Sequence, residues 1–138
     1  SEATEKVHVL IIGSGPAGEK GACQAAYFGK RVALIEKEPI LGGAAANTGT
    51  LPSKTLRETA LYLSGFRQRG LYGINFTLKD KVTARDFLYR EQQVVRAEQA
   101  RIAENLKRHK VDIYHGMASF AGQHLIEVRP QHSSAAQL

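Results

Sequence analysis

A glycine-rich turn and one acidic side chain are the residues whose types and spacing suggest chemistry in this sequence. The run Gly13–Gly18 reads G-S-G-P-A-G, and Glu36 follows 18 positions after its last glycine. Glycines at this spacing allow a tight turn and let a phosphate approach the backbone. The pattern therefore indicates a dinucleotide site, with the phosphates held at the amino end of a helix.

Each residue of the turn has an expected part in binding. Gly13 permits the turn, Gly15 leaves room for the pyrophosphate, and Gly18 lets the helix pack on the preceding strand. Pro16 and Ala17 open the helix, whose positive end faces the phosphates. All five residues are predicted to bind the dinucleotide.

Glu36 restricts which dinucleotide the site accepts. A carboxylate at this position accepts hydrogen bonds from the two hydroxyls of an adenosine ribose and repels a 2′-phosphate. The residues themselves are therefore consistent with NAD or FAD, and they exclude NADP(H) at this site.

A strand, a helix and a second strand must position these residues. Residues 7–12 and 31–36 are short apolar runs without alternation, which is typical of strands buried on both faces of a parallel sheet. Between them, small residues recur at helical spacing and let the helix lie close to the sheet. The sequence thus predicts a right-handed βαβ unit with parallel strands over residues 6–36.

Two helices are expected next. Segment 41–52 is rich in glycine and alanine and is interpreted as a loop, which a helix over residues 53–69 follows. Residues 83–86 resemble a capping box that opens a long helix reaching Leu106. The two helices are expected to run antiparallel, as a helical insertion over residues 50–110.

Further strands are expected after the helices. Residues 111–115 are predicted to form a third strand that ends in 116–120, while 125–129 alternates and starts an antiparallel excursion. Residues 71–82 suggest an irregular connection, and 130–138 is a tail without a pattern. The predicted fold class is α/β, a Rossmann-like doubly wound parallel sheet that is incomplete and carries a two-helix insertion.

The segment Gly42–Lys54 resembles the flavin-facing segment of the pyridine nucleotide-disulfide oxidoreductases. Its pattern is G-G-x-x-x-N-x-G-x-x-P-S-K, and the resemblance extends over roughly residues 6–129. It implies FAD as the cofactor, a nicotinamide nucleotide, NAD(P)H, as a substrate of the intact protein, and a homodimer. It also implies that Lys54 is catalytic and places a positive charge beside the flavin N5. The other residues it assigns to the cofactor are Lys37, Gly42, Gly43, Thr48, Gly49, Thr50, Gly116, Met117 and Ala118.

The chain departs from the disulfide reductases of that family where they carry two redox-active cysteines. The aligned positions are Ala45 and Thr50, and the single cysteine, Cys23, is expected to be a buried, inert thiol on the first helix. A dithiol relay is therefore excluded, and hydride transfer through the flavin alone remains. Within the family, the chain is most similar to soluble NAD(P)⁺ transhydrogenases and to dihydrolipoamide dehydrogenase-like proteins without the redox cysteines.

Three functions stay open at this point. The leading hypothesis is an FAD-dependent enzyme that transfers hydride between nicotinamide nucleotides without a redox disulfide. The alternatives are an FAD-dependent NAD(P)H dehydrogenase with a quinone or another small acceptor, and a non-catalytic nucleotide-binding module. No second G-x-G-x-x-G follows in the 138 residues, so the chain is expected to be the N-terminal portion of an FAD-binding domain, inactive alone.

The composition argues against metal, nucleic-acid and membrane binding. The formal charge is +6, but charges over residues 85–110 alternate in sign, as on a solvated helix face, and no basic cluster with interleaved aromatic residues indicates nucleic acid. The five histidines show no metal-ligand spacing. No apolar run approaches the roughly 18–20 residues that span a bilayer. We therefore expect a soluble, cytoplasmic protein with no metal site and no nucleic-acid or membrane partner.

Overall fold

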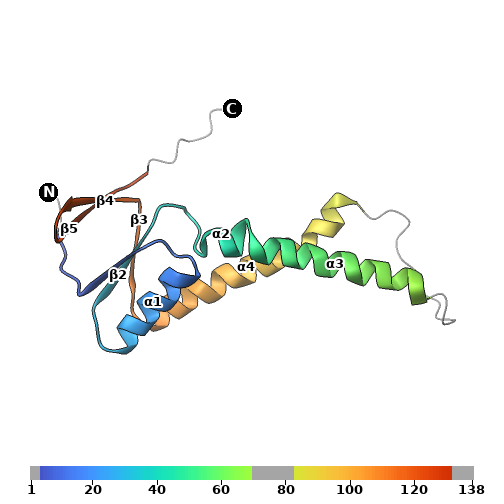
Figure 1. Cartoon of the computed structure of the whole chain (residues 1–138), viewed down its shortest axis with the longest axis horizontal. Coiled ribbons are helices and arrows are strands. Elements are labelled where there is room, and N and C mark those ends of the chain that lie inside the picture. Colours follow the sequence, from blue (N-terminus) through green and yellow to red (C-terminus); the bar gives the residue numbers. More distant parts are fainter. Residues whose placement is uncertain (1–3, 70–82, 132–138) are drawn as a thin grey trace. The chain divides into compact units, whose positions relative to one another are not determined.

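The computed structural model describes residues 4–69 and 83–131. The expected irregular connection 71–82 and most of the expected tail lie outside the described residues. The described part divides into two compact units, and the helices and strands of both are labelled in Figure 1. The first contains residues 4–43 and 99–131, and the second contains the described residues between 44 and 98. No helix in the described ranges combines the length and apolarity needed to cross a membrane.

The first unit is built on a parallel sheet in the order β1-β2-β3. Its strands are β1 (Val9–Ile12), β2 (Val32–Glu36) and β3 (Asp112–His115). Every residue of the central strand β2 is buried, as its continuous apolar run predicts. Within the described part of the chain β1 pairs with β2 alone, so β1 forms one edge of the sheet. The burial on both faces that its apolar run predicts is therefore not found, since its first three residues are half-buried and Ile12 is 55% exposed. The predicted parallel α/β fold class is thus confirmed.

Helix α1 (Pro16–Tyr27) connects β1 to β2 and is composed largely of small residues. Pro16 stands at its first position, where the missing N–H costs no hydrogen bond. Ala22 is completely buried, and the chain reverses at Gly29, whose φ is +77°. The helix therefore has the extent and the close-packed character that its small residues predict.

Helix α4 (Ala84–Arg108) begins in the second unit and ends in the first. At its start, Thr83 N and Oγ1 both donate to Asp86 Oδ2, at 2.9 and 2.8 Å, and Asp86 N donates to Thr83 Oγ1 at 3.3 Å. The predicted capping box is therefore confirmed. Near its end, Ile102 and Leu106 are buried and contribute to the core of the first unit.

A two-stranded antiparallel sheet corrects the expected end of the third strand. The segment 116–120 does not prolong β3; most of it belongs to β4 (Met117–Gly122), which pairs with β5 (Leu125–Arg129). The chain bends at Gly116, between the two strands, and a Cβ there would lie 2.6 Å from the carbonyl oxygen of Arg129, so this bend has no room for a side chain. The antiparallel excursion predicted for residues 125–129 is confirmed.

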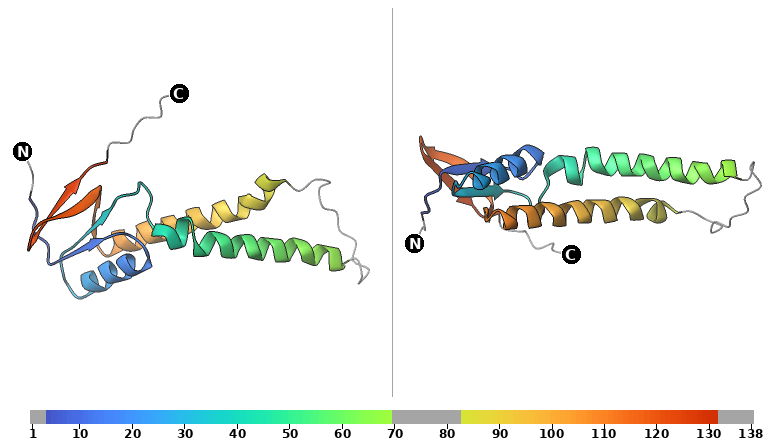
Figure 2. Two further views of the ribbon diagram at one scale, coloured as in Figure 1. Left: turned by 45° about the horizontal axis from the view of Figure 1, so that its top comes forward. Right: turned by 90° about the horizontal axis from the view of Figure 1, so that it is seen from below.

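The second unit corrects the loop expected over residues 41–52. Most of that segment is helical, in α2 (Gly43–Asn47) and the first turn of α3 (Thr50–Arg69). Consecutive alanines favour helix more strongly than the flanking glycines oppose it, and Pro52 is tolerated in a first turn. Figure 2 shows α3 and the first part of α4 running side by side in opposite directions, as expected.

Candidate functional site

The turn between β1 and α1 has the open backbone that a phosphate group needs. Gly13 adopts a φ of +99°, a backbone conformation that residues with a side chain rarely adopt. A Cβ on Gly13 or Gly15 would meet no atom within 4 Å. Gly15 caps the helix without any side-chain hydrogen bond. The positive end of α1 therefore faces open space above the glycines, and a pyrophosphate fits these features.

Gly18 has the opposite surroundings, because it lies against the turn itself. A Cβ at this position would lie 2.0 Å from the Gly13 carbonyl oxygen and 3.3 Å from Ile11 Cγ2. No side chain fits that space without moving the backbone. The expected close packing of helix on strand is present at this residue.

Glu36 ends β2 directly beside the turn, and its side chain is 5% exposed. Its Oε2 accepts hydrogen bonds from Ser14 N, at 2.8 Å, and from the Ser14 hydroxyl, while Oε1 accepts one from Glu38 N at 3.0 Å. Burial by itself raises the pKa of Glu36, but these hydrogen bonds outweigh it and hold the pKa below its ordinary value. The carboxylate is therefore ionised at neutral pH and lies beside the glycine turn.

The segment after β2 closes onto the same turn. Gly42 and Gly43 adopt positive φ values of +110° and +63°, and a Cβ on Gly43 would lie 3.0 Å from Gly15 Cα. Gly42 N donates to Ser14 Oγ at 3.1 Å. These two predicted cofactor residues thus lie against the glycine turn, whereas Lys37 is exposed after the end of β2.

Gly116, the residue after β3, also lies beside Glu36. Its N–H donates to the Glu36 carbonyl oxygen at 2.9 Å, and the preceding residue, His115, pairs with Glu36 in the sheet register. Met117 and Ala118 follow at the start of β4. The first unit therefore brings together the predicted residues of the turn, the acidic strand end, Gly42, Gly43 and Gly116.

The remaining predicted residues belong to the second unit. Thr48 and Gly49 follow α2, and their N–H groups both donate to the Ala44 carbonyl oxygen, at 3.0 and 2.6 Å. Thr50 begins α3, and its carbonyl oxygen accepts a hydrogen bond from Ser53 Oγ at 3.1 Å. Thr48 and Gly49 thus close the end of α2 through backbone hydrogen bonds, and the Ser53 side chain makes one at the start of α3.

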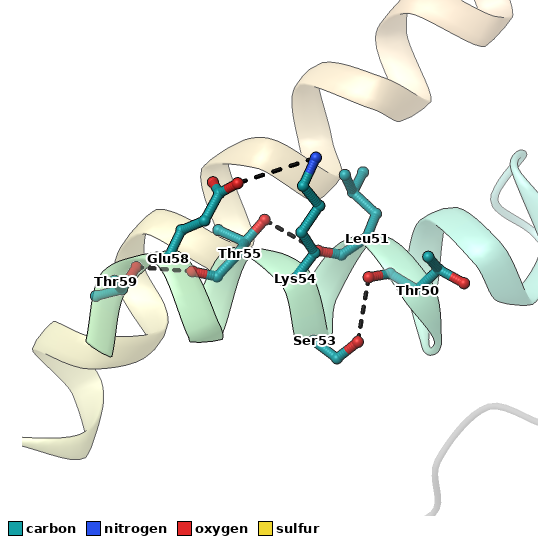
Figure 3. A network of polar contacts seen from close by, with 7 residues as sticks. All are labelled: Thr50, Leu51, Ser53, Lys54, Thr55, Glu58 and Thr59. Atoms are coloured by element: carbon teal, nitrogen blue, oxygen red, sulfur yellow. Dashed lines mark hydrogen bonds and ion pairs between the residues drawn. The ribbon is translucent and has the colours of Figure 1, made fainter. Parts of the chain in front are cut away.

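Lys54 lies in the first turns of α3, and its side chain is exposed. Its Nζ is 3.9 Å from Glu58 Oε1, and the two side chains point toward each other in Figure 3. Their exposed fractions are 68% and 64%, so this ion pair is weak. The ammonium group is therefore held loosely by its own helix and is free to take another orientation.

A cleft of about 680 Å³ lies between α3 and α4 inside the second unit. The Thr55 and Thr59 hydroxyls donate to the carbonyl oxygens four residues earlier, both at 2.9 Å, so their protons are already engaged (Figure 3). Charged groups at the cleft come from Lys54, Glu58 and Arg90. The lining residues are Leu51, Lys54, Thr55, Glu58, Thr59, Tyr62, Arg90 and Val94.

Cys23 is the single cysteine of the sequence, and its thiol is buried. Ala45 lies in α2 and Thr50 starts α3, so neither position supplies sulfur. Cys23 is 8% exposed on α1, and burial raises the pKa of its thiol, with a further increase from Glu19 and a decrease from Arg101. The predicted burial of Cys23 is confirmed. No group of three His, Cys, Asp or Glu side chains in residues 4–69 and 83–131 is placed to hold a metal ion.

Ser14 is the functional candidate that the sequence reasoning missed. The motif treats this position as variable, yet Ser14 is completely buried and contacts both Glu36 and Gly42. The one available signal is that Ser14 carries the only hydroxyl in the run Gly13–Gly18.

Comparison with known proteins gives consistent matches. Residues 8–127 match a family model described as FAD dependent oxidoreductase. The chain is 46% identical over 123 residues to a soluble pyridine nucleotide transhydrogenase from Mycobacterium tuberculosis, covering 89% of this chain and 26% of the relative. It is 36% identical over 134 residues to a protein of the same name from Hahella chejuensis, covering 92% and 27%.

A solved structure agrees in fold. The HOCl-induced flavoprotein disulfide reductase RclA from Escherichia coli, determined as a Cu(II) complex, superposes with a TM-score of 0.71 at 27% identity. The superposition covers 91% of this chain and 25% of that structure. The chain thus spans about a quarter of the length of the curated relatives it matches.

Proposed function

This chain belongs to the FAD-dependent oxidoreductases and, within them, to the pyridine nucleotide-disulfide oxidoreductases, and we propose that it supplies the FAD-binding site of an enzyme that transfers hydride between nicotinamide nucleotides. The observation that carries the proposal is the buried, ionised Glu36 beside the open glycine turn. A carboxylate placed there suits a ribose diol, and the amino end of α1 suits a pyrophosphate.

The residues of the first unit would hold the ADP portion of FAD. Backbone N–H groups at the start of α1 would bind the pyrophosphate, and Glu36 would accept hydrogen bonds from the ribose hydroxyls. The backbone at Gly116 and Ala118 would face the adenine, beside Lys37. The proposal is supported by the way Gly43 and Gly116 already lie against the turn and Glu36.

The residues of the second unit would serve the flavin end. FAD supplies hydride chemistry at its flavin ring when it is bound. We assign Lys54 to the flavin as a positive charge, because its exposed ammonium has only a weak partner in Glu58. Thr48, Gly49 and Thr50 would line the ribityl chain and the ring, since backbone contacts fix the short connection they form.

Transfer between nicotinamide nucleotides is favoured over disulfide reduction by the missing thiols. Ala45 and Thr50 carry no sulfur, and Cys23 is buried in α1 with a raised pKa, which disfavours a thiolate. The relatives named soluble pyridine nucleotide transhydrogenase support the same reaction class. We extend the proposal to use of NADP(H) as one substrate and to a homodimer, as the family resemblance implies, and to a cytoplasmic location.

The reaction is tested by assaying four acceptors with the full-length protein. We expect hydride transfer from NADPH to a chromogenic NAD⁺ analogue, without reduction of glutathione disulfide or lipoamide. Robust disulfide reduction that Cys23→Ser abolishes would overturn the exclusion of a thiol mechanism. Activity with a quinone but none with the NAD⁺ analogue would favour an NAD(P)H dehydrogenase instead.

A further inference from the structure

Ser14 occupies a junction of the first unit that the proposed function does not yet use. Its side chain is 0% exposed, and it lies between the phosphate-binding turn, the end of β2 and the segment that follows β2. Its partners are 22 and 28 residues away along the chain. A hydroxyl buried this deeply at a ligand site has either a packing role or a role in holding another group.

The hydrogen bonds of the Ser14 hydroxyl have a fixed direction. Its only proton goes to Glu36 Oε2, because the other partner, Gly42 N, is itself a donor, at 3.1 Å. The Ser14 backbone N–H donates to the same carboxylate oxygen at 2.8 Å. A change in χ1 that moved Ser14 Oγ away from Glu36 would also leave the buried Gly42 amide unpaired, which is costly.

These bonds fix the carboxylate of Glu36 in one orientation. One oxygen faces Ser14 with two donors, and the other accepts from Glu38 N at 3.0 Å. A carboxylate held at both oxygens loses little further freedom when a ribose binds, so the ligand pays less of the ordering cost. The Gly42 contact also joins this carboxylate to the segment that packs on Gly15.

We propose that Ser14 is a positioning residue for the adenosine end of FAD, whose hydroxyl orients Glu36 toward the ribose and ties the Gly42 segment to it. This inference rests on the proposed FAD site. It assigns to Ser14 an effect on affinity that is transmitted through Glu36. A mere packing role would instead disturb the turn whether or not Glu36 is present.

A double-mutant cycle on FAD affinity tests this distinction. The dissociation constant is measured for full-length wild type, Ser14→Ala, Glu36→Ala and the double variant, with Ser64→Ala as control. Ser64 is exposed on α3 and donates only to the Leu61 carbonyl oxygen, at 2.8 Å, so its loss should leave affinity unchanged. We expect Ser14→Ala to weaken binding about tenfold when Glu36 is present, and less than about twofold when Glu36 is alanine.

A second experiment replaces the Glu36 variants if they do not fold. An FAD analogue whose adenosine ribose lacks the 2′-hydroxyl replaces the mutation, and the penalty of Ser14→Ala should shrink with this ligand. Equal penalties in both backgrounds or with both ligands, or no penalty at all, would overturn the positioning role and leave the FAD site standing. Wild-type protein that does not bind FAD would overturn the proposed function and this inference together.

Discussion

The two units of the molecule differ in the burial and the hydrogen-bond partners of their polar side chains. In the first, Ser14, Glu19 and Glu36 are buried and bonded to partners far away in sequence. In the described residues of the second, Thr55 is the buried polar residue, and it bonds only to its own helix. The charged pair of Lys54 and Glu58 lies in solvent.

This difference separates two ways of building a ligand site. Buried polar contacts between distant segments fix a side chain in one orientation, as in the recognition of the ribose that we propose for the first unit. Helical backbone alone places Lys54 and leaves its side chain adjustable. We therefore expect substitutions in the first unit to have large effects and matched substitutions in the second to have small ones.

The largest contrast is expected between two helical glycines. Gly18→Ala should destabilise the fold by about 3 kcal/mol or more and abolish FAD retention, because its Cβ would lie 2.0 Å from the Gly13 carbonyl oxygen. Gly65→Ala on α3 meets no atom within 4 Å and should stabilise by about 0.5–1 kcal/mol. Thermal unfolding of both variants measures the contrast, and equal effects would contradict it.

A smaller contrast is expected between two ion pairs. Glu19 is 4% exposed; its carboxylate accepts from Asn105 Nδ2 at 3.0 Å and lies 3.1 Å from the Arg101 guanidinium. The Arg101 side chain is itself 54% exposed, so solvent screens this pair, and Arg101→Met should cost about 1 kcal/mol. Glu58→Gln breaks only an exposed pair and should change stability by less than about 0.5 kcal/mol. Urea unfolding of the two variants compares them; an Arg101→Met cost no greater than that of Glu58→Gln would show that the buried pair is not stabilising.

The smallest effect is the response of stability to acid. The hydrogen bonds at Glu36 hold its pKa in the folded protein below that of the unfolded chain, which is about 4.3. Ionised Glu36 therefore stabilises the fold above that pH, and this contribution is lost as the pH falls through the folded-state pKa. Urea titrations of wild type and Glu36→Gln should thus differ at pH 7 and converge in acid. Curves that stay parallel at every pH would contradict the role of these hydrogen bonds.

Local signals account for the parts of the fold that the sequence predicts correctly. The continuous apolar runs at β1 and β2, the glycine turn between them and the capping box at Thr83 each act within a few residues, and all are present. The close packing at Gly18 follows from the same motif. These features could be predicted without knowing which distant segments contact one another.

Features that depend on competing or distant contacts could not be predicted in the same way. The helix α2 was hidden because flanking glycines suggest a loop, although the alanines between them favour helix. The start of β4 depends on Gly116, whose backbone lies close to the carbonyl oxygen of the distant Arg129. The role of Ser14 depends on Glu36 and Gly42 reaching it from two other segments, which no spacing rule along the chain reveals.

We propose that Glu36 recognises FAD, and one measurement tests this recognition most directly. The dissociation constant for FAD is determined by flavin fluorescence titration of the full-length protein, Glu36→Ala and Glu38→Ala. Glu38 is exposed two residues away and contacts Glu36 through its backbone, so it serves as the matched control. We predict that Glu36→Ala weakens binding by about tenfold to a hundredfold, whereas Glu38→Ala stays within about twofold. Unchanged affinity in Glu36→Ala would contradict the claim.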